Sequence, residues 1–213
     1  PKDLKFSSAV FGMSGVNCLQ DEGIIRSAIG KYFRPMIPRQ FVLVNDVVIA
    51  LYSGLKHKAG IAVIAGTGSN CFGINGQGEE ASTGGLGHSI SDEGSAYDIG
   101  IRALRAAAKS HDGRGPRTIL EPMVRAFFKA RTFRDITHAL YHTHQTKFEI
   151  ARIAPLVESS ARRGDRVARA ILDDAVGELV LMFGTAARRL KLLKRPCDVV
   201  LSGGVFHNNK YVY

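Results

Sequence analysis

The sequence has few cysteines, no apolar segment long enough to cross a membrane and no block of like charges. Its cysteines, Cys18, Cys71 and Cys197, are far apart and odd in number. They indicate neither a disulfide framework nor a zinc site. The longest apolar runs, residues 42–51 and 60–65, are far shorter than the about 20 residues of a spanning helix. With no signal peptide visible, the sequence predicts a cytosolic protein with no membrane partner.

The chain is basic, with 29 Lys and Arg against 19 Asp and Glu and a net charge of +10. A nucleic-acid surface is one hypothesis for such a charge. However, the cations are scattered, and residues 152–195 mix both signs in a helical pattern. This pattern is typical of solvated helix faces rather than a binding arm. An anionic substrate such as ATP would also be favoured by a positive field.

Strand-like segments end repeatedly at glycine-rich or acidic turns, and helical patterns lie between them. We predict buried strands at residues 8–13, 41–44, 61–65 and 198–201. A hairpin is predicted at residues 70–74 and 79–83, around Asn75-Gly76-Gln77-Gly78. Predicted helices cover residues 21–32 (with Ile24, Ile25, Ala28 and Ile29 on one face), 47–55, a stretch from Asp92 to about Leu193 broken near 112–116 and 164, and a short helix from His207 or Asn208.

This alternation indicates an α/β architecture with ligands at the carboxyl ends of the strands. The segment 57–60 reads as a link between domains. We therefore predict an N-terminal α/β lobe at residues 1–58 and a C-terminal α/β lobe at residues 59–213. The second lobe would carry a helical insertion at about residues 101–195.

Two glycine turns follow predicted strands. In Gly66-Thr67-Gly68-Ser69-Asn70, the glycines would allow close approach of the backbone to an anion, and the hydroxyls could donate to phosphate oxygens. The alternative is a plain hairpin turn. Ser202-Gly203-Gly204 leads a strand into a helix start, which suits a nucleotide, although it could equally be a tight packing turn.

Carboxylates stand at two further positions. Asp46 follows an apolar strand, where a rigidly held carboxylate could act as a general base or could cap the next helix. Asp92 and Glu93 follow the glycine cluster at residues 84–87. This pair could bind sugar hydroxyls, but a helix cap is the commoner role for such residues.

Histidines could suggest a metal site, because His138 and His142 share a helical face and His144 follows. No nearby carboxylate completes such a site, so we predict no protein-held metal there. For His88, a structural polar role is the simpler interpretation.

The chain resembles the N-acetylglucosamine kinases of the BadF/BadG/BcrA/BcrD ATPase family, within the acetate and sugar kinase, Hsp70 and actin superfamily. Six motifs carry the resemblance in family order. They are Gly-Met-Ser-Gly, Val-Asn-Asp, Gly-Thr-Gly-Ser-Asn-Cys, Gly-Gly-Leu-Gly-His, Asp-Glu-Gly-Ser-Ala-Tyr and Leu-Ser-Gly-Gly. The resemblance is densest over residues 41–100 and recurs at 199–206. It implies an actin-like (ribonuclease H-like) fold in which two lobes close on a cleft holding ATP and sugar.

By position, the resemblance makes Asp46 the base that takes a proton from the sugar hydroxyl before in-line attack on the γ-phosphate. It implies a nucleotide-binding role for residues on both glycine turns: Gly66, Thr67, Gly68, Gly203 and Gly204. It implies a sugar-binding role for residues around the cleft: Ser14, Asn45, Asp46, Ser69, Asn70, Gly85, Leu86, Gly87 and Asp92. Mg²⁺ would accompany ATP, and a homodimer is compatible with the family.

The sequence departs from the family pattern at two places. Leu86 stands where these kinases have a tryptophan, which leaves the identity of the sugar open. The glycine-rich first phosphate loop is also missing, so we expect an N-terminal lobe that is incomplete. We also expect a chain that ends soon after the turn Ser202-Gly203-Gly204. Two alternatives remain: an ATPase that activates 2-hydroxyacyl-CoA dehydratases, which needs bridging iron–sulfur cysteines, and a non-catalytic sugar or nucleotide sensor.

Overall fold

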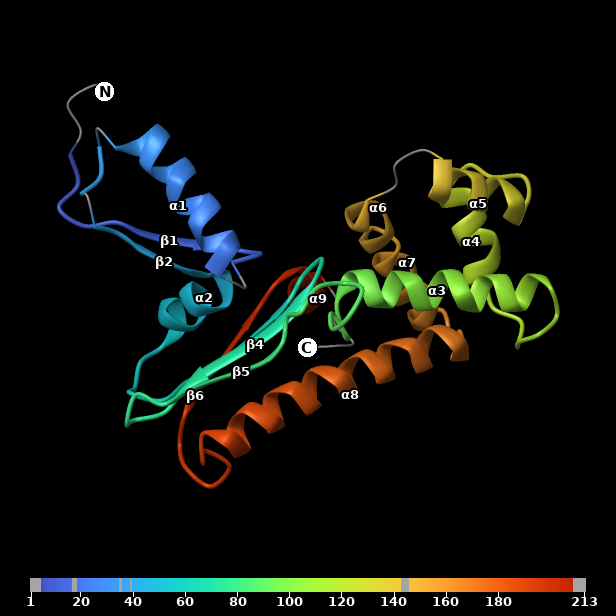
Figure 1. The fold of residues 1–213 in the computed structure, drawn as a ribbon. Coiled ribbons are helices and arrows are strands. Elements are labelled where there is room, and N and C mark those ends of the chain that lie inside the picture. Colours follow the sequence, from blue (N-terminus) through green and yellow to red (C-terminus); the bar gives the residue numbers. More distant parts are fainter. Residues whose placement is uncertain (1–4, 17–18, 35, 39, 143–145, 209–213) are drawn as a thin grey trace.

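The structure, a computed structural model, describes residues 5–16, 19–34, 36–38, 40–142 and 146–208. Its elements form a small sheet with its own helices, a larger sheet, and a group of helices beside the larger sheet (Figure 1). In chain order they are β1 Val10–Met13, α1 Leu19–Phe33, β2 Val42–Asn45, α2 Asp46–Gly54, β3 Gly60–Ala65, β4 Ser69–Ile74, β5 Glu80–Gly84, α3 Ala96–His111, α4 Leu120–Phe127, α5 Phe133–His142, α6 Lys147–Ala151, α7 Ala154–Arg162, α8 Arg166–Arg189, β6 Asp198–Ser202 and α9 Gly204–Asn208.

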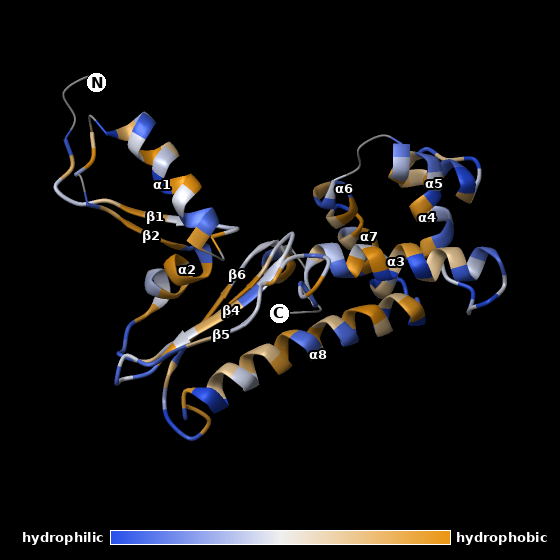
Figure 2. Ribbon diagram, viewed as in Figure 1, coloured by the Kyte–Doolittle hydropathy of each residue, from blue (hydrophilic) through white to orange (hydrophobic). Residues whose placement is uncertain are grey.

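In the small sheet, β1 and β2 pair in parallel from Val10 opposite Val42 to Met13 opposite Asn45. The prediction that these strands are buried is wrong for most of their side chains, since Val10 is 57% exposed and Val42 is 52% exposed. Apolar colours nevertheless dominate both strands in Figure 2. Apolar composition therefore identified the strands, but their exposure depends on what packs on them.

Helix α1 also differs from its prediction in which side chains are buried. The predicted helix is present, but Ile24 is 71% exposed whereas Ile29 is only 5% exposed. The two isoleucines are five residues apart, which places them on different sides of the helix. The predicted single apolar face is therefore wrong, and only one side of α1 is buried.

The larger sheet has the strand order β5-β4-β3-β6, with β6 parallel to β3 and both hairpin pairings antiparallel. Strand β3 is buried on both faces, which explains its unbroken apolar sequence. Ile61 and Val63 join the core beneath α8 and α3, whereas Ala62 packs with Val47 and Leu51 of α2 on the opposite face. The predicted strands and the Asn75–Gly78 hairpin are confirmed. The prediction that residues 198–201 are buried is wrong, since Val199 is 51% exposed and Leu201 is 40% exposed.

The helical segment after the hairpin packs largely around α3, and the long helix α8 runs along the sheet (Figure 1). The predicted breaks near residues 112–116 and 164 are present. Two predicted starts are wrong. Helix α3 begins at Ala96, where the Ser95 side chain accepts the N–H of Asp98, and α9 begins at Gly204 rather than at His207. None of the helices in the described part of the chain is long and apolar enough to cross a membrane.

Candidate functional site

The strand topology brings the predicted turns to one end of the two sheets. Strands β1 and β2 are parallel and lead directly into Ser14 and Asp46. Strands β3 and β6 are parallel and lead directly into Gly66 and Gly203. The register also places Asn70 opposite Gly84, directly before Gly85. Residues far apart in the sequence therefore meet because strand ends of the same polarity share an edge.

A polar cleft of about 340 Å³ lies at this edge. It includes eight of the residues predicted to bind substrate: Ser14, Asn45, Asp46, Ser69, Asn70, Gly85, Gly87 and Asp92. Gly66, Thr67 and Gly68 also line it. Leu86 does not line this cleft and is 63% exposed at its rim, while Gly203 and Gly204 lie outside it.

Asn45 and Asp46 occupy the junction between β2 and α2. The Asn45 side chain caps α2 by accepting the N–H of Val47 at 3.2 Å. The alternative in which Asp46 caps the helix is therefore wrong, because Asp46 is the first residue inside it. Its half-buried carboxylate lines the cleft, and an anion in the first helical turn is also favoured by the helix dipole.

Asp92 lies against the glycine turn and does not cap α3, so the alternative in which it caps the helix is wrong. It is 8% exposed, and its Oδ1 accepts the N–H of Ser69 at 3.4 Å. Burial raises the pKa of Asp92, an effect opposed by the Ser69 N–H and by the positive charges of Lys147 and His88. A Cβ on Gly68 would come within 2.9 Å of the Asp92 carboxylate. Glycine is thus needed there for close contact with an acid.

A hydrogen bond between two side chains joins the two sheets across the cleft. Asn70 Nδ2 donates to Asn45 Oδ1 at 3.2 Å, linking β4 to the end of β2. Gly85 packs over Asn70, and a Cβ at Gly85 would lie 2.5 Å from the Asn70 Cγ. Gly85 also has a φ of +72°, which glycine adopts without strain. The glycine cluster thereby fixes Asn70 in place.

The turn at Gly66 and Thr67 is held by backbone bonds to α3. Its two carbonyls accept the N–H groups of Ala96 and Tyr97 at 2.8 and 3.3 Å. A Cβ at Gly66 would meet nothing within 4 Å. Gly203 has a φ of +109°, and its Cα approaches the Ala65 carbonyl so closely that a Cβ would overlap it. Gly203 therefore packs β6 tightly against the start of this turn.

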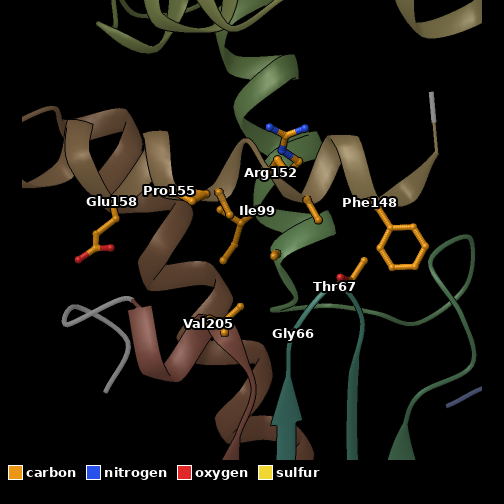
Figure 3. A pocket seen from close by; sticks show the side chains of 12 residues that line it. Gly66, Thr67, Ile99, Phe148, Arg152, Pro155, Glu158 and Val205 are labelled. Atoms are coloured by element: carbon orange, nitrogen blue, oxygen red, sulfur yellow. The ribbon is translucent and has the colours of Figure 1, made fainter. Parts of the chain in front are cut away.

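A second cavity, of about 460 Å³, adjoins the turn on its other side. Its walls are mainly apolar, and Figure 3 shows Ile99 and Val205 pointing into it, with Thr67 and Phe148 at one end. Gly66, Thr67 and Phe148 line both this cavity and the polar cleft. Gly204, but not Gly203, lies in its wall.

Sequence reasoning missed three side chains from α6 and its C-terminal end. Lys147 lines the polar cleft, Arg152 lines the second cavity, and Phe148 lines both. The available sequence signal was a helix start, because Thr146 and Glu149 form a capping box. That signal predicts a helix but not its position over the two cavities.

Other predicted groups remain apart from the cleft. The rings of His138 and His142 are 4.9 Å apart, and His144 lies outside the described residues. Among the described residues, no group of three His, Cys, Asp or Glu side chains could hold a metal ion. Cys71 is fully buried, and burial raises the pKa of its thiol to about 11.

Solved structures with this fold include two candidate N-acetylglucosamine kinases. The protein from Chromobacterium violaceum has a TM-score of 0.71 at 26% identity, and the one from Porphyromonas gingivalis has a TM-score of 0.70 at 17% identity. Each comparison covers 96% of this chain and 68% of the solved chain. The mixed sheets and their helices form an actin-like ATPase fold.

Two curated relatives are sugar kinases by name. The N-acetylmuramic acid/N-acetylglucosamine kinase of Clostridium acetobutylicum is 39% identical over 207 residues, 97% of this chain and 67% of that protein. The N-acetyl-D-glucosamine kinase of Dictyostelium discoideum is 30% identical over 206 residues, 95% of this chain and 64% of that protein. The chain thus spans about two thirds of the length of these relatives.

The match to a protein family covers almost the whole chain. The sequence model of the BadF/BadG/BcrA/BcrD ATPase family matches residues 5–213. The chain belongs to the BadF/BadG/BcrA/BcrD ATPase family.

Proposed function

We propose that the protein transfers the γ-phosphate of ATP to a hydroxyl of an amino sugar, with N-acetylglucosamine as the reference substrate. The observation that carries this proposal is the position of Gly66 and Thr67, which line both the polar cleft and the mainly apolar cavity. A sugar in the first and a nucleotide in the second would meet at this turn. The names of the relatives support the same reaction.

In this mechanism the polar cleft orients the sugar. The Asp92 carboxylate accepts hydrogen bonds from its hydroxyls. The Ser69 hydroxyl, which donates to the Glu93 carbonyl at 2.7 Å, can accept one more, and Asn70 is positioned by its hydrogen bond to Asn45. Asp46 accepts the proton of the reacting hydroxyl as that oxygen attacks the γ-phosphorus. The bond to the β-phosphate oxygen then breaks and ADP leaves. Positioning and charge stabilisation supply most of the rate in such transfers.

The nucleotide would lie along the second cavity. The open space beside Gly66 leaves room for a phosphate group to approach the backbone. Thr67 would donate its hydroxyl to that phosphate, while Gly203 shapes the turn and Gly204 contributes to the wall of the adenosine pocket.

Mg²⁺ fits this arrangement as an ion that arrives with ATP. Such ions are held mainly by phosphate oxygens and water, with one or two protein carboxylates. Asp46 and Asp92 line the polar cleft, where this mechanism assigns them to the sugar hydroxyls, so phosphate oxygens and water would supply most ligands of the ion. When bound, the ion would neutralise charge on the β- and γ-phosphates.

The decisive variant is Asp46→Asn, measured in the protein at the full length that its gene encodes. Loss of the base should lower kcat by about 10²- to 10⁴-fold, while calorimetry should give nearly unchanged binding of N-acetylglucosamine. Phosphorylated sugar is measured by mass spectrometry alongside ADP release. Asp112→Asn, at an exposed carboxylate after α3, is the matched control and should leave kcat unchanged.

Two other outcomes would contradict the proposal. Full activity of Asp46→Asn would show that another group takes the proton. Sugar binding without any ADP release or sugar phosphate would instead identify a sensor. The dehydratase-activator alternative gains no support from Cys71, because a buried thiol with a raised pKa is poorly suited to hold an iron–sulfur cluster.

A further inference from the structure

Lys147 places a positive charge on the sugar side of the site. It lines the polar cleft together with Asp46 and Asp92, but not the second cavity, where Arg152 is found instead. The ring of Phe148 lies at the border and contributes to both walls. Lys147 in α6 and Arg152 directly after it thus line different compartments.

The Lys147 ammonium has no carboxylate partner within ion-pair distance among the described residues. Its Nζ lies 5.7 Å from the centroid of the Phe148 ring, a cation–π contact that leaves its hydrogen-bond donors available. The backbone beneath it is fixed, because Thr146 caps α6 by accepting the N–H of Phe148 at 3.3 Å. The charge is therefore held at the cleft with no ion-pair partner in the described part of the chain.

This positive charge acts at the Asp92 end of the cleft. Both Lys147 and His88 favour the ionised form of Asp92 and so lower its pKa, although burial raises it overall. Leu86, between the cleft-lining Gly85 and Gly87, is 63% exposed. Because Lys147 and Asp92 line the same cleft, a substituent on a sugar bound at Asp92 would share that cleft with the ammonium.

We propose that Lys147 binds a carboxylate carried by the substrate, so that the cleft accepts an acidic amino sugar as well as a neutral one. This inference rests on the proposed sugar kinase function. Without Lys147, an acidic substituent would meet the like charges of Asp46 and Asp92, which would repel it. A lysine pairing with that substituent offsets the repulsion through charge-assisted hydrogen bonds.

The test compares N-acetylglucosamine with N-acetylmuramic acid, which adds a carboxylate-bearing ether to the same sugar. In Lys147→Met, kcat/KM for the acidic sugar should fall about tenfold or more, as expected when a charge-assisted pair is lost. The value for the neutral sugar and the KM for ATP should change less than about twofold. Lys147→Arg should retain most activity on the acidic sugar, and Lys58→Met, at an exposed lysine before β3, should alter neither.

Several results would overturn the inference without touching the proposed function. One is phosphorylation of the neutral sugar with none of the acidic sugar in the unaltered protein. Another is an equal loss for both sugars, or a raised KM for ATP alone, in Lys147→Met, which would assign the lysine to phosphate. If neither sugar is phosphorylated, the proposed function fails. Calorimetry then decides the inference: binding of N-acetylmuramic acid weakened by Lys147→Met supports it, and unchanged or absent binding overturns it.

Discussion

At the residue scale, Gly203 is a position where an added Cβ should lower the stability of the fold. Its φ is +109°, and a Cβ would overlap the carbonyl of Ala65 at the end of β3. Gly203→Ala should therefore lower the free energy of unfolding by about 3 kcal/mol or more, because backbone strain and steric overlap add. Urea denaturation followed by circular dichroism measures this directly.

Gly177→Ala is the matched control for Gly203. This glycine lies inside α8, and a Cβ there would meet nothing within 4 Å. Alanine favours a helix interior over glycine by about 0.5–1 kcal/mol, so this variant should be slightly more stable. A Gly203→Ala protein as stable as the unaltered one would refute the tight packing of β6 against the Gly66 turn.

Residue identity alone could not distinguish these glycines. The strings around Gly66, Gly68 and Gly203 predicted special turns, and the structure gives each a different reason for being glycine. Gly68 leaves space for a carboxylate, and Gly66 faces open space. Gly203 has a positive φ and leaves space for a backbone carbonyl. Those reasons depend on neighbours from other parts of the chain, Asp92 and Ala65.

At the element scale, Asp198 ties the start of β6 to the segment before β3. Its carboxylate accepts the N–H groups of Lys56 and His57, each at 2.7 Å, and contacts His57 Nδ1 at 2.9 Å. These hydrogen bonds lower the pKa of Asp198 from 3.8 to about 2, and the bond with the His57 ring has the largest effect. A lowered pKa means that the stabilisation is complete above pH 3.8 and is lost as pH falls towards about 2.

The prediction concerns the steepness of acid destabilisation. Between pH 4 and about pH 2, the urea midpoint of the unaltered protein should fall more steeply than that of Asp198→Asn, which has no carboxylate to titrate. Glu80→Gln, at an exposed residue of β5, should keep the original steepness. Parallel curves for the unaltered protein and Asp198→Asn would show that the pairing does not contribute to stability.

Element positions were predicted well where the signal was local. The apolar run of β3, the Asn75–Gly78 hairpin and the breaks in the helical segment were all read from neighbouring residues. The start of α3 was not, because Ser91, Asp92 and Ser95 are all acceptable caps. Only the approach of Asp92 to the Ser69 N–H leaves Ser95 as the cap.

At the scale of the whole molecule, α2 connects the two sheets. It begins at the end of β2 and packs on β3, β4 and β6 of the larger sheet. Leu51, which is fully buried, lies in the apolar cluster with Ala62 and Phe72. Leu51→Ala should lower the free energy of unfolding by about 2–5 kcal/mol through lost burial and a residual cavity.

Chemical denaturation of Leu51→Ala should also report on the coupling of the two sheets. If α2 joins the two sheets, they should unfold together. Two spectroscopic probes should then give the same unfolding midpoint, at a lower denaturant concentration than in the unaltered protein. Tyr52→Ala, 57% exposed on the same helix, should change stability by about 1 kcal/mol or less. Equal effects of the two substitutions would mean that α2 does not form part of the core.

The sequence by itself determined the α/β pattern, the order of the strand ends and the motifs that mark the polar cleft. These signals are local, because strand periodicity, turns and hairpins involve residues close along the chain. Only the tertiary structure decided that Asp92 faces Ser69, that Asn70 bonds to Asn45 across 25 residues, and that Lys147 and Phe148 reach the cleft. Such pairs form when sheets and helices pack, and no local pattern records which distant surfaces will meet.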